Sequence, residues 1–261
     1  MKHNLNDVAF LIQTRLDSID RLVNLRSTVK YILEHFDTNI HILEADRYNS
    51  QLVSMVVPAE VKVMFVEDFD PIYHRTYYVN EMLKACRSPI ISIWEPDVIV
   101  PVEQVLQAVE WLRKQQADFV SPYEKRALDT STFIRELFLS SGEWTVLEKH
   151  EHKMKQMYPP NPVGGVFFAN RKTYIESGMD NQNIYGWGIE DGERVNRWIS
   201  LGYTYKRVQG NLYHLTHARG LNSNFYSKED RNIKLRELNR IISMSKEELR
   251  EEVSLESNVK S

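Results

Sequence analysis

The chain has 261 residues, 42% hydrophobic and 26% charged, which is ordinary for one large globular domain. Its net charge of −3 gives no electrostatic reason to expect a nucleic acid partner, and no stretch approaches the roughly 20 apolar residues of a membrane span. Cys86 is the only cysteine, which excludes an internal disulfide and favours a reducing compartment. We therefore expect a cytoplasmic protein, with peripheral attachment to a membrane as the alternative.

The first half of the chain alternates between short apolar runs and helical patterns. Val8–Ile12 predicts a buried strand, and apolar residues at helical spacing predict a helix from about Arg21 to His35. Further expected elements are strands at Asn39–Leu43, Val61–Val66, Pro89–Trp94 and Phe119–Val120 and helices at Tyr73–Ala85 and Val102–Gln116. This alternation is typical of an α/β fold in which helices are layered on a sheet.

Ligands of such sheets bind beyond the carboxyl ends of the strands. That rule selects the loops at Arg15, Glu44 and Asp97. The last of these, Trp94-Glu95-Pro96-Asp97, places two carboxylates at the end of a buried strand, and carboxylate oxygens suit Mg²⁺ or Mn²⁺. Acidic residues at a strand end also commonly cap the next helix, so this motif by itself is a weak sign of a metal.

The second half of the chain is organised differently. Residues 123–162 are charged and rich in His and Lys, and we expect a helical insertion or lid over a site rather than part of the sheet core. Later expected elements are a strand at Gly164–Phe168, helices at Arg171–Ser177 and up to about Leu201, and a strand through Tyr203–Tyr213. The tail Ser227–Glu252 predicts an amphipathic helix packed on the domain by an apolar stripe of Ile233, Leu235, Leu238, Ile241 and Ile242.

The motif Gly186-Trp187-Gly188-Ile189-Glu190-Asp191 stands between a strand pattern and a helix pattern. The indole of Trp187 offers an apolar face for a sugar ring, and the flanking glycines permit turns and close approach by a ligand. Glu190 and Asp191 can accept hydrogen bonds from hydroxyl groups, and one of them can act as a general base. The alternative is a glycine-rich turn followed by acids that favour the helix dipole.

Two histidines follow at Tyr213-His214-Leu215-Thr216-His217. On an extended strand this spacing would point the two imidazoles to opposite faces, so they converge only if the strand ends and the chain turns near Ala218-Arg219-Gly220. Imidazole together with carboxylate favours Mn²⁺ over Mg²⁺. Two half-buried histidines bonded to the backbone are the alternative.

In this order the motifs resemble the GT-A glycosyltransferases, especially the β-1,4-galactosyltransferase group and bacterial polysaccharide glycosyltransferases. The resemblance covers roughly Ala9 to Asn224. It implies a GT-A fold, which is Rossmann-like with a central mixed sheet flanked by helices. The expected division is a catalytic domain at 1–225, made of a nucleotide-sugar-binding half (1–122), an insertion or lid (123–162) and an acceptor and metal half (163–225), followed by a helix and tail at 226–261.

The resemblance also implies roles for single residues. Asp191 would be the catalytic base, and acceptor sugar would be bound by Trp187, Gly188 and Glu190. The metal, Mn²⁺ with Mg²⁺ as the alternative, would be held by Asp97, His214 and His217, and the donor nucleotide would be contacted by Thr14, Arg15, Glu44, Arg75 and Glu95. The chain departs from the family where Glu95 replaces an aspartate, where Ile189 replaces a glycine and where Gly192 replaces an acid.

The function implied is an inverting, metal-dependent transfer of a hexose (galactose, N-acetylgalactosamine or glucose) from a UDP-sugar. The acceptor would be a hydroxyl of a glycan or lipid-linked oligosaccharide, in cell-surface polysaccharide synthesis. Two alternatives stay open: a metal-dependent nucleotide-sugar hydrolase or nucleotidyltransferase, and a non-catalytic sugar-nucleotide-binding domain. Neither alternative explains Trp187 together with the two acids.

Overall fold

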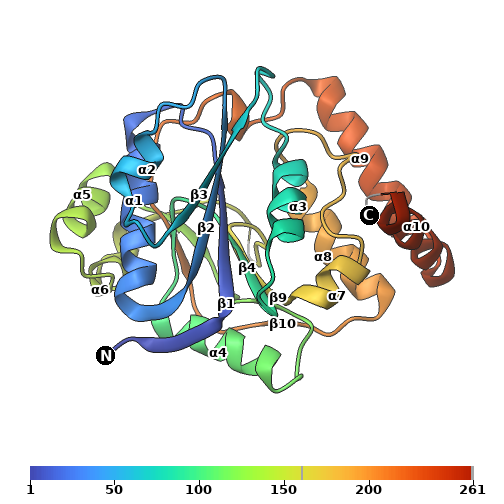
Figure 1. Cartoon of the computed structure of the whole chain (residues 1–261), viewed down its shortest axis with the longest axis horizontal. Helices are drawn as coiled ribbons and strands as arrows, with labels where there is room; N and C mark the ends of the chain where they lie inside the picture. Colours follow the sequence, from blue (N-terminus) through green and yellow to red (C-terminus); the bar gives the residue numbers. More distant parts are fainter. Residues whose placement is uncertain (160, 260–261) are drawn as a thin grey trace.

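The structure, a computed structural model, describes residues 1–159 and 161–259 and is built around a seven-stranded mixed sheet (Figure 1). Pro160 of the expected insertion and residues 260–261 of the expected tail lie outside the described residues. The strand order is β10-β6-β9-β4-β1-β2-β3, and β9 runs antiparallel to both of its neighbours. The strands are β1 (His3–Thr14), β2 (Phe36–Asp46), β3 (Lys62–Glu67), β4 (Ile90–Trp94), β6 (Phe119–Ser121), β9 (Val166–Asn170) and β10 (Tyr205–Arg207).

Helices cover both faces of this sheet (Figure 1). Along β1, Val8 and Phe10 belong to one buried cluster and Ala9 and Leu11 to the other, as the alternation of a strand requires. The first cluster is completed by α1, α2 and α4, and the second by α3, α7 and α8. These helices are α1 (Ile19–His35), α2 (Leu52–Val56), α3 (Arg75–Ala85), α4 (Val102–Arg113), α7 (Arg171–Glu176) and α8 (Glu190–Leu201).

The strand order changes direction at β1. The chain runs outward from β1 through β2 to β3, and then returns to β4 on the other side of β1, with Val8 opposite Ile90. Such a switch point opens a crevice beyond the carboxyl ends of the two central strands. Thr14 ends β1 there, and Glu95 directly follows β4.

A second, four-stranded sheet has the order β5-β11-β7-β8. Its strands are β5 (Val98–Ile99), β7 (Ala127–Asp129), β8 (Lys155–Gln156) and β11 (Leu212–His214). Two of them lie in residues 123–162, together with α5 (Thr132–Ser141), α6 (Thr145–Lys149) and the 3₁₀ turn η1 (Glu151–Lys153). The segment that we expected to be helical and outside the core thus also contributes strands, and Leu128, Ile134 and Phe138 from it are buried.

The last part of the chain differs from the expected elements in two places. Residues 203–213 form not one strand but two, β10 and β11, because the chain turns at Gly210 with φ +138° and passes to the other sheet. The tail forms two helices, α9 (Lys228–Ser243) and α10 (Lys246–Val259), after the 3₁₀ turn η2 (Leu221–Ser223). Ser245 interrupts the helix because its hydroxyl accepts a hydrogen bond from the amide of Glu248 and caps α10.

Helices α9 and α10 pack beside α8 (Figure 1). Of the expected apolar stripe, Ile241 is buried against Leu201 and Leu249, whereas Ile233 and Ile242 are exposed. The tail is therefore docked on the domain through only part of that stripe. Across the described residues, none of the helices combines the length and the apolar character that crossing a membrane would need.

Candidate active site

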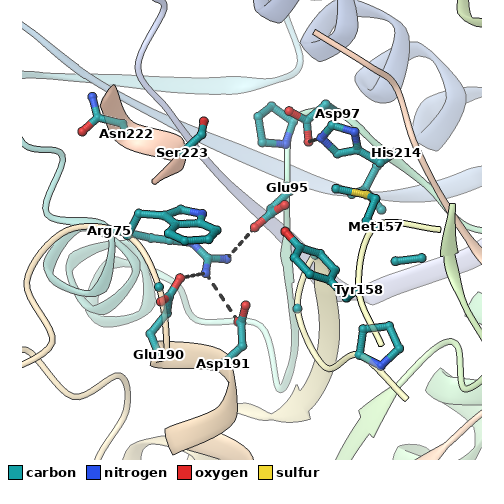
Figure 2. A pocket seen from close by; sticks show the side chains of 18 of the residues that line it. Arg75, Glu95, Asp97, Met157, Tyr158, Glu190, Asp191, His214, Asn222 and Ser223 are labelled. Atoms are coloured by element: carbon teal, nitrogen blue, oxygen red, sulfur yellow. Dashed lines mark hydrogen bonds and ion pairs between the residues drawn. The ribbon is translucent and has the colours of Figure 1, made fainter. Parts of the chain in front are cut away.

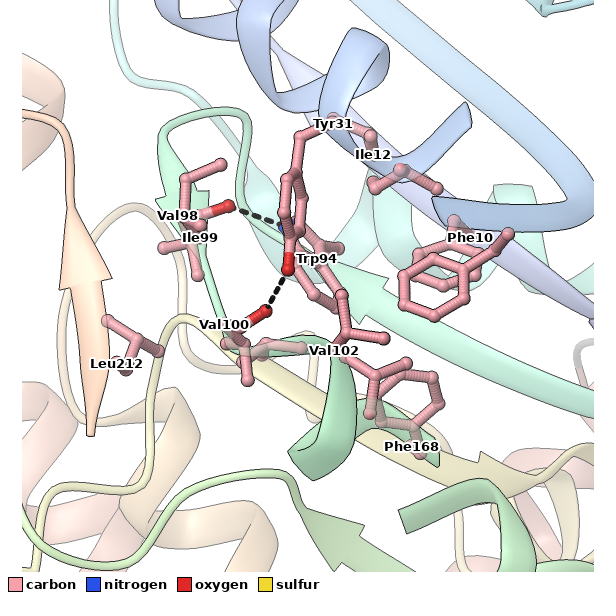
Figure 3. Packing of buried hydrophobic residues seen from close by; sticks show 14 of the residues in the cluster. Phe10, Ile12, Tyr31, Trp94, Val98, Ile99, Val100, Val102, Phe168 and Leu212 are labelled. Atoms are coloured by element: carbon pink, nitrogen blue, oxygen red, sulfur yellow. Dashed lines mark hydrogen bonds between the residues drawn. The ribbon is translucent and has the colours of Figure 1, made fainter. Parts of the chain in front are cut away.

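Core packing positions the turn that carries Glu95 and Asp97. The indole N–H of Trp94 donates to the carbonyl of Val98 at 2.9 Å, and the hydroxyl of Tyr31 on α1 donates to the carbonyl of Val100 at 2.6 Å (Figure 3). Both aromatic side chains are buried, so the turn is tied at two points to the interior of the protein. A rigid turn of this kind can hold a carboxylate in a fixed place.

Asp97, His214 and His217 converge at this turn. Strand β5 pairs antiparallel with β11, with Val98 opposite His214, and this pairing brings residues far apart in sequence together. Asp97 lies 3.6 Å from His214 Nε2 through Oδ1 and 3.1 Å from His217 Nε2 through Oδ2. Strand β11 ends at His214, and His217 follows in the turn, as the expected convergence of the two imidazoles requires.

The three side chains fit a divalent metal ion. One ligand atom from each lies within 4.8 Å of the others. The Nδ1 atoms face away from this centre: that of His214 lies 2.8 Å from Asp129 Oδ1, and that of His217 lies 2.7 Å from the carbonyl of Ala218. With Nδ1–H donating in each case, both Nε2 atoms are left as free lone pairs, which is how metal-binding histidines are oriented.

The electrostatics keep Asp97 in its ionised form. Burial raises the pKa of its carboxyl, but His214 and His217 in their protonated forms, together with Arg21, outweigh that effect, so the pKa of Asp97 is well below its usual range when no metal is bound. Arg21 on α1 lies 3.8 Å from Asp97 and also donates to the hydroxyl of Ser223 at 3.0 Å. An anionic oxygen donor beside two imidazoles suits Mn²⁺.

The Gly186–Asp191 motif forms a turn that leads into α8. Gly186 and Gly188 have φ values of +79° and +103°, which glycine adopts without cost. Ile189 follows with φ +78° although it is β-branched, a strained conformation for such a residue. The turn ends by placing Glu190 and Asp191 at the first positions of α8, where the helix dipole favours acids.

Arg75, the first residue of α3, connects the two sets of acids (Figure 2). Its guanidinium lies 3.2 Å from Glu95, 2.9 Å from Glu190 and 3.4 Å from Asp191. Burial raises the pKa of Glu190, repulsion from Asp191 adds to this, and Arg75 opposes both. Among the described residues Glu190 Oε2 has no hydrogen-bond partner although it is buried, so a ligand hydroxyl would satisfy it.

Asp191 is held through one carboxylate oxygen, and no donor to the other oxygen is found among the described residues. Its Oδ1 accepts hydrogen bonds from Arg75 and from Arg194, whose guanidinium also lies 2.8 Å from buried Asp180. Its Oδ2 faces the backbone of Gly164, where a Cβ atom would leave it too little space. Asp191 Oδ2 is therefore the carboxylate oxygen that is available to a bound ligand.

One cavity of about 420 Å³ joins these groups. Its size is within the range of small-molecule sites. The predicted residues on its wall are Thr14, Arg15, Arg75, Glu95, Asp97, Trp187, Gly188, Glu190, Asp191, His214 and His217. Asp97, His214 and His217 thus face the same cavity as Glu190 and Asp191.

A sequence model of the family described as the N-terminal domain of galactosyltransferase matches residues 148–219, which include both the Gly186–Asp191 motif and the two histidines. None of the curated proteins matches the chain in sequence. Among solved structures, it is similar to glucosyl-3-phosphoglycerate synthase from Mycobacterium tuberculosis in complex with Mn²⁺, UDP and phosphoglyceric acid, with 15% identity, a TM-score of 0.54, and coverage of 90% of this chain and 78% of that chain. The same identity and TM-score are found for a mannosyltransferase from Pyrobaculum calidifontis in complex with GDP-Man and Mn²⁺, with 82% of this chain and 58% of that chain covered.

The chain has the GT-A glycosyltransferase fold. The expected fold class, a central mixed sheet flanked by helices, is thereby confirmed, and so is the resemblance to galactosyltransferases over residues 148–219. Both kinds of comparison agree with the expected class of enzyme, a glycosyltransferase.

The residues predicted to contact the donor nucleotide differ in whether they face the cavity and in whether their polar groups already have partners. Thr14 lines the cavity, and its buried hydroxyl has no partner among the described residues, so it is available to a ligand. Arg15 also lines the cavity, but its guanidinium already donates to the carbonyls of Ala45 and Asp70 and pairs with Asp68. Glu44 is buried on β2 and is not among the residues that line the cavity. Their contacts with a donor nucleotide stay predictions.

The structure adds three residues whose contacts in the site were not predicted from the sequence. Asp129, which orients His214, lies in the charged 123–162 segment and approaches the histidine only because β7 pairs with β11. Arg194 follows Asp191 by one helical turn, a spacing that could have indicated the pair. Gly164 was expected as the start of a strand that precedes the Gly186–Asp191 motif, but not as the residue that makes room for Asp191.

Proposed function

We propose that this protein is an inverting, metal-dependent glycosyltransferase that transfers a hexose from a UDP-sugar to a hydroxyl of a glycan. One observation carries the proposal: Asp97, His214 and His217 share a cavity with Glu190 and Asp191. A site that only bound a nucleotide sugar would have no need of a carboxylate oxygen such as Asp191 Oδ2, which lacks a donor among the described residues and lines the same cavity as Asp97, His214 and His217. The GT-A fold supports the same class of reaction.

The reaction that suits these residues is one direct displacement. The acceptor hydroxyl, with its sugar ring against Trp187 and hydrogen-bonded to Glu190, attacks the anomeric carbon of the donor from the side opposite the leaving group. The new carbon–oxygen bond forms as the bond from the anomeric carbon to the diphosphate breaks, and UDP leaves. The proton of the hydroxyl passes to Asp191 Oδ2. Attack from the opposite side inverts the anomeric centre.

Residues Asp97, His214 and His217 would hold Mn²⁺ or Mg²⁺. When bound, such an ion supplies positive charge that stabilises the departing diphosphate. The glucosyl-3-phosphoglycerate synthase structure contains Mn²⁺ and UDP, and the mannosyltransferase structure contains Mn²⁺ and GDP-Man. We propose UDP rather than GDP because the chain matches galactosyltransferases over residues 148–219. Galactose, N-acetylgalactosamine and glucose are the candidate sugars, and a glycan or lipid-linked oligosaccharide of a cell-surface polysaccharide is the proposed acceptor.

The first experiment is a donor screen. Purified protein is incubated with Mn²⁺ and each of UDP-galactose, UDP-N-acetylgalactosamine and UDP-glucose, with and without an oligosaccharide mixture, and released UDP is measured. We expect release from one donor, stimulated by acceptor and abolished by chelation of the metal. Release that does not depend on acceptor, with free sugar as the product, would indicate a hydrolase instead, and no turnover of any donor would contradict the proposal.

The Asp191→Asn variant tests the base. It should bind Mn²⁺ and UDP as the native protein does, while transfer falls by about 10²–10⁴-fold, because a general base contributes that much. Glu229→Gln is a matched control, since Glu229 is an exposed carboxylate on α9 that pairs only with Arg236 among the ion pairs of the described residues. Native turnover by Asp191→Asn would show that another group takes the proton.

A further inference from the structure

Helix α9 lies outside the segment that matches the galactosyltransferase family, yet it carries a buried lysine that contacts the Gly186–Asp191 turn. Lys234 is only 2% exposed. Its ammonium donates to the main-chain carbonyl of Trp187 at 2.9 Å and to Asp230 Oδ2 at 2.9 Å. A lysine ammonium has three N–H groups, and burial of one is costly unless they are used. These two contacts use two of the three N–H groups of Lys234.

The third direction faces an aromatic ring. Lys234 Nζ lies 5.6 Å from the centre of the Phe225 ring, within the range of a cation–π interaction. Phe225 in turn meets Trp187 edge to face, with ring centres 5.4 Å apart at an interplanar angle of 74°. Its ring also lies so close to Gly188 that a Cβ there would be 2.8 Å from it. Lys234 and Phe225 thus contact the turn at Trp187 and Gly188, and they also contact each other.

A second contact from the same helix holds the chain just before the turn. One helical turn after Lys234, Glu237 Oε1 accepts hydrogen bonds from the side chains of Asn181 and Asn183, at 2.8 and 3.3 Å. Residues 181–187 are therefore attached to α9 near both ends. The turn itself has few constraints of its own, because its glycines are free to adopt other conformations.

We propose that Lys234 is a positioning residue for the sugar-binding face of the site. It acts through Trp187: by holding the carbonyl of that residue, it determines where the indole stands against the cavity. The role of Trp187 in sugar binding rests on the proposed function, but the positioning of Trp187 by Lys234 does not. Helix α9 is then part of the active site's support rather than a tail packed on a finished domain.

The experiment observes Trp187 directly. The full chain, which has five tryptophans, is labelled with 5-fluorotryptophan, and the ¹⁹F resonance of Trp187 is identified by its loss in Trp187→Phe. In Lys234→Met, which keeps the length of the side chain but removes the donor, we expect the Trp187 resonance to shift or broaden while the other four stay in place. The Kd for Mn²⁺–UDP, measured by calorimetry, should stay within about twofold because the metal trio is not touched.

A matched control separates positioning from general loosening of the helix. Ile241→Ala removes a buried side chain from the same helix but leaves the contacts of Lys234, so its Trp187 resonance should match the native one. The proposal is overturned if Lys234→Met leaves the Trp187 resonance unchanged or if Ile241→Ala shifts it equally. Should Lys234→Met fail to fold, Lys234→Gln, which keeps a polar group but shortens the side chain, tests the same contact, and an unchanged Trp187 resonance there would also overturn the proposal. The spectra need no donor or acceptor, so their outcome is independent of whether the protein transfers sugar.

Discussion

Gly164 offers the sharpest test of how the candidate base is held. A Cβ atom at this position would lie 3.2 Å from Cγ of Asp191 and less than 3.0 Å from its Oδ2, where ordinary contacts begin at 3.4 Å. The backbone φ of Gly164 is not in the left-handed region, so alanine meets no strain of its own there. The whole effect of Gly164→Ala must therefore act through the Asp191 carboxylate.

The magnitude follows from how little that carboxylate can move. It would have to retreat by several tenths of an ångström to about 1 Å to restore normal contact. Arg75 and Arg194 hold Oδ1, so retreat weakens those ion pairs. Overpacking of this kind costs about 1–3 kcal/mol of stability. A displacement of about 1 Å in a reacting group costs about 10²-fold in rate, and we expect that loss in kcat/KM.

The assay is acceptor-dependent UDP release, with Gly192→Ala as the matched control. Gly192 directly follows Asp191, and a Cβ there would meet nothing within 4 Å, so this variant should keep native activity. It should also gain up to about 1 kcal/mol of stability, because alanine is the better helix former. Combined with Asp191→Asn, Gly164→Ala should cause no further loss. Native kcat/KM in Gly164→Ala, or an additive loss in the double variant, would refute the reasoning.

Two further predictions concern the metal centre and the docking of α9. Asp129→Ala should raise the Kd for Mn²⁺ by about 10–100-fold, since it removes the acceptor that orients His214, and calorimetry that finds the native Kd would contradict this role. At Glu237, hydrogen bonds from Arg240, Asn181 and Asn183 lower the pKa of the carboxyl to about 2 despite partial burial. The ionised carboxylate therefore stabilises the fold at pH values above its ordinary pKa of 4.5, and this stabilisation is lost as the pH falls towards 2. The Tm of Glu237→Gln should therefore fall less between pH 6 and pH 3 than the Tm of the native protein. Equal falls in Tm would show that the ionised Glu237 carboxylate does not stabilise the fold.

The central strands were predictable because each is a short apolar run, as strands buried on both faces must be. Val8–Ile12 is the apolar middle of β1, whose polar ends at His3 and Thr14 give no such signal. The two-residue strand β5 and the three-residue strand β7 escaped prediction, since neither is long enough to show a period. Their existence depends on β11, which comes more than 80 residues later than β7.

The candidate site likewise contains some residues that the sequence could identify and others that it could not. Side chains whose chemistry is evident from their type and order, such as Trp187, Asp191 and His217, could be named from the sequence. Glu44 was selected because it lies at the end of a strand, but neighbouring strands place it in the interior and not on the cavity wall. Asp129 and Lys234 could not be named, because a carboxylate or an ammonium in a charged segment looks the same whether it faces solvent or a buried partner.

The sequence by itself determined the class of fold, the order of the central elements and the residue types available for chemistry. Those properties depend on hydrophobic period and on local composition, both of which can be read over a few residues. Only the tertiary structure decided that Asp97, His214 and His217 meet, that Arg75 joins Glu95 to Glu190, and that α9 supports Trp187. Each of these contacts joins segments that are distant along the chain, and the energy that selects them comes from packing and charge pairing in the folded core.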